Sequence, residues 1–153
     1  MLNKKYKIIL LIVFFLVLSC KKEAIDQQNK IAEYQINFII QGDSFSKNIT
    51  QSYRTTKSVF EIMLDLKKQN QLDFKFTGEG DNIFITEIHQ IQNEGFGKEK
   101  KNWLYFINGE LAQKGVSQTI IEKNTEILWC YTKWEDKEQC INKNQGEKND
   151  KKY

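Results

Sequence analysis

Trp103-Leu104-Tyr105-Phe106-Ile107-Asn108-Gly109 is the segment of this chain with the clearest structural pattern. Five successive apolar or aromatic residues are typical of a buried β-strand. They run directly into Asn-Gly, the strongest short-range signal for a hairpin, because both residues tolerate the positive φ of a type I′ turn. Alternation places Trp103, Tyr105 and Ile107 on one face of the strand and Leu104 and Phe106 on the other. We therefore predict a sheet strand that ends in a tight hairpin.

Similar alternating patterns predict strands on both sides of this stretch. Tyr34, Ile36, Phe38 and Ile40 fall on one face of an extended segment, and a turn at Gly42-Asp43 leads into a weaker strand at 44–50. Further strands are predicted at 72–76, 83–88 and 126–131. Residues 90–102 are polar and contain two glycines, which predicts a surface loop.

One helix is clearly indicated, and it begins after Ser58. Ser58 and Glu61 have the spacing of a capping box, in which each side chain accepts a hydrogen bond from the other residue's backbone amide. Val59, Ile62, Met63 and Leu66 then form one apolar stripe at helical spacing. Together with the strands, this predicts an α+β fold in which one helix packs across a mixed sheet. A sheet with one helix leaves its second face open.

The pattern resembles a known domain family. Residues 103–109, followed by Gly115-Val116 and by the strand at 126–129, are similar to the domain of unknown function (DUF4430) that also forms the C-terminal domain of transcobalamin and intrinsic factor. Residues 58–63 and 83–88 are similar to the family's helix start and to the strand before the tryptophan strand. The resemblance covers roughly residues 34–134. It implies a β-grasp-like domain that the vitamin carriers use to cover one face of cobalamin.

The N-terminus is typical of a bacterial lipoprotein precursor. Three lysines precede an apolar run from Ile8 to Leu18, which is much shorter than the roughly 20 residues of a membrane-spanning helix. Ser19 and Cys20 follow, and residues 17–20 resemble a lipobox. We expect residues 1–19 to be removed and Cys20 to carry the lipid anchor. An ordinary signal peptide with a chance cysteine is the alternative.

This interpretation divides the rest of the chain and predicts its location. Residues 20–33 form a lipidated tether, residues 34–134 the folded domain, and residues 135–153 a charged tail that we expect to be disordered. The protein is expected to be lipid-anchored to the cell envelope, at the outer membrane, facing the periplasm or the cell surface. Processing removes three of the 23 basic residues and none of the 20 acidic ones. The processed chain then has equal numbers of basic and acidic residues, so its net charge gives no reason to expect binding to nucleic acid.

Catalysis is not indicated by the sequence. An enzyme needs a nucleophile with a base, a metal cluster or a phosphate-binding glycine loop. His89 is the only histidine, and the glycine pairs at 78–80 and 95–97 are too short for a nucleotide-binding fingerprint. We predict no catalytic residues, no metal ligands and no resident cofactor.

Cys130 and Cys140 are the only cysteines besides Cys20. Outside the cytoplasm they could form a disulfide that ties the start of the tail to the last strand. The alternative is one buried strand cysteine and one free tail cysteine. Spacing along the chain does not decide between them.

Two hypotheses for the function remain open. The resemblance implies a binding module for cobalamin, another cobamide or a similar flat ligand, with a rim formed by the 108–109 turn and residues 113–117. The residues assigned to this site are Trp103, Tyr105, Asn108, Gly109, Gly115 and Val116. Trp103 and Tyr105 would supply flat apolar contact, or they would lie in the core as aromatic strand residues usually do. The second hypothesis is a protein-interaction or accessory subunit of an outer-membrane or surface complex.

Overall fold

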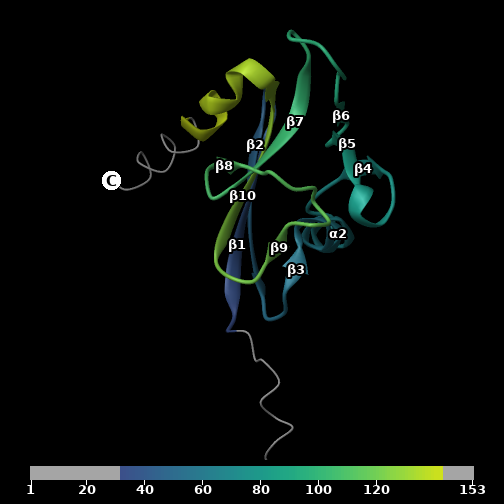
Figure 1. The fold of residues 1–153 in the computed structure, drawn as a ribbon. Helices are drawn as coiled ribbons and strands as arrows, with labels where there is room; N and C mark the ends of the chain where they lie inside the picture. Colours follow the sequence, from purple (N-terminus) through teal and green to yellow (C-terminus); the bar gives the residue numbers. More distant parts are fainter. Residues whose placement is uncertain (1–31, 143–153) are drawn as a thin grey trace, which may run out of the picture. The chain divides into compact units, whose positions relative to one another are not determined.

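The largest sheet has five strands in the order β2-β1-β10-β7-β8 (Figure 1). The computed structural model describes residues 32–142. β1 and β10 are parallel and the other neighbours are antiparallel, so the sheet is mixed, as the sequence predicted. The strands are β1 (Tyr34–Gln41), β2 (Ser46–Tyr53), β7 (Lys101–Ile107), β8 (Glu110–Leu111) and β10 (Thr125–Lys133).

Two smaller sheets are formed by the segments that connect β2 to β7 and β8 to β10 along the chain. β3 (Lys57–Ser58) pairs with β9 (Ile120–Ile121). The other sheet has the order β4-β5-β6, and a 3-10 turn, η1, precedes β5. These elements are β4 (Phe74–Thr77), η1 (Gly80–Asn82), β5 (Phe84–Ile88) and β6 (Ile91–Gln92).

The segment predicted as a surface loop, residues 90–102, is more ordered than its composition suggested. It contains β6 and the first two residues of β7. Asn93 explains the difference, because its side-chain amide donates to the Ile85 carbonyl (2.8 Å) and accepts from the Trp103 amide (2.7 Å). A polar side chain thus joins the small sheet to β7, which hydrophobic periodicity cannot detect.

The predicted helix is confirmed as α2 (Val59–Lys68). The capping box is present, with the Ser58 amide donating to Glu61 Oε2 (2.7 Å) and the Glu61 amide donating to Ser58 Oγ (3.2 Å). The four residues of the predicted stripe are all buried. They pack on the face of the large sheet that carries the alternate residues of β1 from Tyr34 to Ile40.

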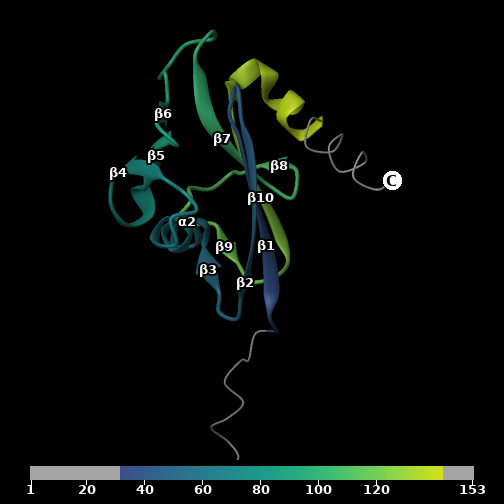
Figure 2. The same cartoon turned by 180° about the vertical axis from the view of Figure 1, so that it is seen from behind.

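The second face of the large sheet is partly covered, which differs from the open face that we predicted. η2 (Trp134–Asp136) and a helical segment at 137–142 follow β10. Figures 1 and 2 show this segment and α2 on opposite sides of the sheet. A second core forms beneath it, from the buried residues Ile39, Phe106, Leu128, Cys130 and Cys140.

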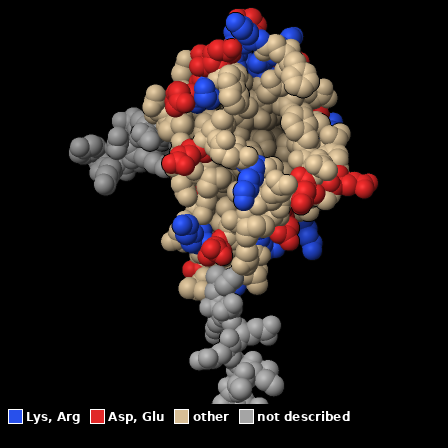
Figure 3. All heavy atoms as spheres, viewed as in Figure 1, with Lys and Arg blue, Asp and Glu red and all other residues tan. Residues whose placement is uncertain are grey.

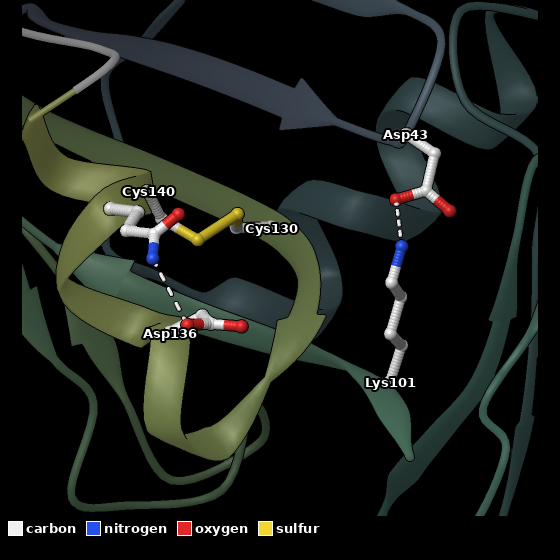
Figure 4. Close-up of a disulfide and its surroundings, with 6 residues drawn as sticks. Asp43, Lys101, Cys130, Asp136 and Cys140 are labelled. Atoms are coloured by element: carbon white, nitrogen blue, oxygen red, sulfur yellow. Dashed lines mark hydrogen bonds and ion pairs between the residues drawn. A yellow bond between two sulfur atoms is a disulfide. The ribbon is translucent and has the colours of Figure 1, made fainter. Parts of the chain in front are cut away.

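Of the two alternatives for the cysteines, the structure contains the bridge. Cys130 and Cys140 are joined by a disulfide that ties the helical segment to β10 (Figure 4). Residues 135–142 therefore differ from the disordered tail that the sequence predicted. The reason is that Cys140 and Ile141 pack on the second core. Residues 1–31 and 143–153, which include the signal peptide, Cys20, most of the tether and the end of the tail, lie outside the described residues. Within residues 32–142, no helix is long and apolar enough to cross a membrane.

The second core predicts how two phenylalanines respond to replacement by alanine. Phe106 is 1% exposed in that core, so Phe106→Ala is expected to lower the free energy of unfolding by about 3–5 kcal/mol. Phe96 is fully exposed, and Phe96→Ala is the matched control, with an expected change within about 0.5 kcal/mol. Urea unfolding followed by circular dichroism measures both. An equal loss of stability in the two variants would contradict the packing of the helical segment on the second face of the large sheet.

Candidate functional site

The β7–β8 hairpin turn is built by its two predicted residues. Asn108 and Gly109 have φ values of 51° and 83°, as the type I′ turn requires. The Asn108 amide donates to the Glu126 carbonyl (2.9 Å), and the Glu126 amide donates to Asn108 Oδ1 (2.9 Å). Asn108 therefore holds the start of β10 beside the turn.

Tyr105 supports the loop that follows β8. Its ring stacks on Trp129, with centroids 5.0 Å apart, and its hydroxyl lies 2.9 Å from Thr119 Oγ1. The hydroxyl also donates to the Lys114 carbonyl. Burial raises the pKa of the Tyr105 phenol, so the side chain stays a neutral donor. Tyr105 thereby connects the aromatic core to the loop at 112–119.

The same loop caps the N-terminus of α2. The Val59 amide donates to the Thr119 carbonyl (2.9 Å), and the Phe60 amide donates to the Val116 carbonyl (3.0 Å). Two amides that have no partner within the helix are satisfied in this way. The loop backbone is consequently fixed by the helix on one side and by Tyr105 on the other.

A cavity of about 460 Å³ lies between the hairpin and this loop. Its walls mix apolar and polar side chains, and the glutamate and lysine among them are exposed. The lining residues are Ile107, Asn108, Glu110, Leu111, Ala112, Gln113, Lys114 and Thr119. The cavity overlaps the rim that the resemblance implied at Asn108, Gln113 and Lys114, whereas Gly109 and residues 115–117 do not line it.

The six residues assigned to the ligand have different positions. Asn108 lines the cavity, and Gly109 completes the turn. Trp103 is 6% and Val116 3% exposed, and both lie in the main core. The Trp103 indole donates to the Ile91 carbonyl (2.8 Å).

Tyr105 and Gly115 do not line the cavity, but both form hydrogen bonds with residues that do. Tyr105 is half-buried and packs against the main core. The Gly115 carbonyl accepts from the amides of Gln118 and Thr119, both at 3.0 Å. The ligand role of these six residues remains a prediction. Sequence reasoning did not find Glu110 and Leu111, since a strand of two residues carries no periodic signal.

Two other cavities have different chemistry. A cavity of about 530 Å³ on the second sheet face has only polar lining residues, among them Gln35, Asn37 and Thr50. A smaller one of about 150 Å³ adjoins the disulfide. A flat apolar ligand needs apolar wall, which the cavity at the hairpin offers through Ile107 and Leu111.

Charge and metal ligands do not single out another site. On the face shown in Figure 3, uncharged residues predominate, and acidic and basic side chains are scattered over it. No group of three or more metal-ligating residues occurs among residues 32–142. His89 is half-buried with its ring edge-on to Phe45, and burial lowers the pKa of its imidazole.

Comparison with known proteins places the chain in a family. Residues 56–133 match the sequence profile of a domain of unknown function (DUF4430), and the chain belongs to this family. No curated protein matches the sequence significantly.

Two solved structures share the fold. A Ruminococcus gnavus protein proposed to bind metal is 18% identical, with a TM-score of 0.50 over 65% of this chain and 97% of its own. Haptocorrin in complex with Cbi is 17% identical, with a TM-score of 0.52 over 68% of this chain. The match spans only 26% of haptocorrin, so this chain corresponds to about a quarter of that protein. These similarities confirm the expected transcobalamin-like fold.

Tyr105 gives a test of whether aromatic packing or hydroxyl bonding fixes the loop. Tyr105→Phe keeps the stack on Trp129 but removes the two hydroxyl contacts, so we expect a loss of about 0.5–1.5 kcal/mol in the free energy of unfolding. Tyr105→Ala also removes the ring and is expected to cost about 3–5 kcal/mol. Thermal unfolding of the two variants beside the unchanged protein measures this. A fully stable Tyr105→Ala variant would instead favour a purely ligand-facing tyrosine.

Proposed function

We propose that this protein is a lipid-anchored binding protein of the cell envelope, whose domain contacts one face of a corrinoid or similar flat ligand. The observation that carries the proposal is the cavity of about 460 Å³ at the hairpin and the 112–119 loop. It overlaps part of the ligand rim that the resemblance to the vitamin carriers implied, at Asn108, Gln113 and Lys114. The shared fold of haptocorrin, solved in complex with Cbi, supports the same ligand class.

The geometry of the cavity suits a partial contact with a large ligand. Leu111 and Ile107 offer apolar surface, and Glu110, Gln113 and Lys114 offer polar groups around it. The backbone on both sides is fixed by the type I′ turn and by the Tyr105 contacts. A site with a fixed backbone loses little conformational entropy when a rigid ligand binds.

The test is a titration of the full chain in detergent with cyanocobalamin. Leu111→Ser removes apolar wall and is expected to weaken binding by about 1–2 kcal/mol. Ile120→Ser is the matched control, because Ile120 is 55% exposed and does not line the cavity. Isothermal calorimetry measures the affinities. An equal loss in both variants, or no binding by the unchanged protein, would sink this proposal.

A second candidate function is docking on a protein complex of the outer membrane or cell surface, and the loop at 94–100 favours it. Phe96 is fully exposed between Gly95 and Gly97, both of which have positive φ. The loop is nevertheless fixed, because the Gly95 amide donates to Asn102 Oδ1 (3.1 Å) and Asn102 Nδ2 donates to the Gly95 carbonyl (2.9 Å). An aromatic side chain presented on a rigid loop is a typical anchor in protein interfaces.

The lipid anchor has its own test. If Cys20 is the lipid acceptor, Cys20→Ala is expected to leave an uncleaved precursor that takes up no label from a palmitate analogue. The double variant Cys130→Ala/Cys140→Ala keeps Cys20 and is expected to be labelled and cleaved normally. Labelling followed by gel electrophoresis and mass spectrometry of the N-terminus reads both results. Normal processing of Cys20→Ala would refute the anchor.

A further inference from the structure

The helical segment at 137–142 touches the back of the β7–β8 hairpin. A Cβ atom placed on Gly109 would lie 3.8 Å from Ile141 Cγ2, so the isoleucine side chain rests against the turn. Leu111 lines the candidate ligand cavity. Leu111 and Ile141 both pack against the second core. The hairpin therefore contacts both the cavity, through Leu111, and the helical segment, through Gly109.

Among the described residues, the disulfide and the packing of Ile141 on the second core link this segment to the sheet. Among residues 134–142, Cys140 is the only buried one, and Ile141 is half-buried. The hydrogen bond between the side chains of Gln139 and Asp136 (3.0 Å) lies within the segment and does not reach the sheet. The position of Ile141 against the hairpin thus depends on the bond between Cys130 and Cys140 (Figure 4).

The disulfide is buried but adjoins a cavity. Cys130 is 6% and Cys140 4% exposed, while both line the cavity of about 150 Å³. Gln41 lies in the same cavity and is 3% exposed, with no hydrogen-bond partner for its amide among the described residues. This space offers a small thiol a route to the sulfur atoms.

We propose that the Cys130–Cys140 disulfide is a redox-sensitive brace of the ligand site, with Ile141 as the positioning residue that supports the hairpin. A dithiol reductant attacks one sulfur as a thiolate and forms a mixed disulfide, and its second thiol then releases the cysteine. Two electrons and two protons pass to the cysteine pair, and the reductant becomes a cyclic disulfide. The helical segment then leaves, and the turn at Asn108 and Gly109 loses its support. The inference rests on the proposed function for its effect on a ligand.

The experiment compares the oxidised full chain in detergent with the same chain reduced by dithiothreitol. Amide exchange at residues 108–113 is expected to rise about tenfold or more on reduction, because the hairpin loses packing, while exchange in α2 stays unchanged. The affinity for cyanocobalamin is expected to fall roughly fivefold or more, since the site is no longer fixed. Cys130→Ala/Cys140→Ala is expected to show the amide exchange and the affinity of the reduced protein. Adding dithiothreitol to this variant is expected to change neither.

A pair of variants separates the brace from a general loss of stability. Ile141→Ala keeps the disulfide and is expected to raise exchange in the hairpin alone, and Ile141→Val is expected to restore it. Asn142→Ala, at the exposed neighbouring position, is the matched control with no expected change. Unchanged hairpin exchange after complete reduction overturns the brace. A hairpin that loosens in a protein that never binds cyanocobalamin upholds the brace and refutes the proposed ligand.

Discussion

The parallel pairing of β1 with β10 determines how the other elements are arranged. It joins residues about 89 positions apart, as in the contact between the side chains of Asn37 and Glu126. Parallel neighbours cannot be joined by a tight turn, so the chain between them has to cross over the sheet. α2 and the two small sheets occupy this crossover, and their apolar side chains form the main core with one face of the large sheet. Because β1 and β10 are central strands, the other face has apolar residues as well.

That second face explains why the chain continues beyond its last strand. Ile39, Phe106 and Leu128 point away from α2 and would meet water if β10 were the end of the domain. The helical segment covers them with one cystine and Ile141, while the other half of the face carries Gln35, Asn37 and Thr50 and remains open. The disulfide adds a covalent link between this segment and β10 to these apolar contacts.

Local signals in the sequence predicted most of the fold. Alternation of apolar residues predicted β1 and which side chains of β7 share a face. The capping box predicted the start of α2, and Asn108-Gly109 predicted the hairpin. Two segments, 90–102 and 135–142, are more ordered than predicted, and both are ordered by contacts between residues far apart in the sequence. Asn93 orders its loop through Ile85 and Trp103, and Cys140 orders its segment through Cys130. Neither arrangement has a periodic pattern.

In the candidate site, too, local sequence patterns could be interpreted, whereas contacts between distant residues could not be predicted. The turn at its rim could be predicted, but alternation only states that Trp103 and Tyr105 share a face, not whether the face meets a ligand or the core. In the structure Trp103 is buried, and Tyr105 connects Trp129 to the loop that caps α2. Any change at these aromatic residues therefore alters the fold together with the site. Selectivity for a ligand is consequently expected to reside in Glu110, Gln113 and Lys114, whose exposed side chains change the chemistry of the cavity without disturbing the core.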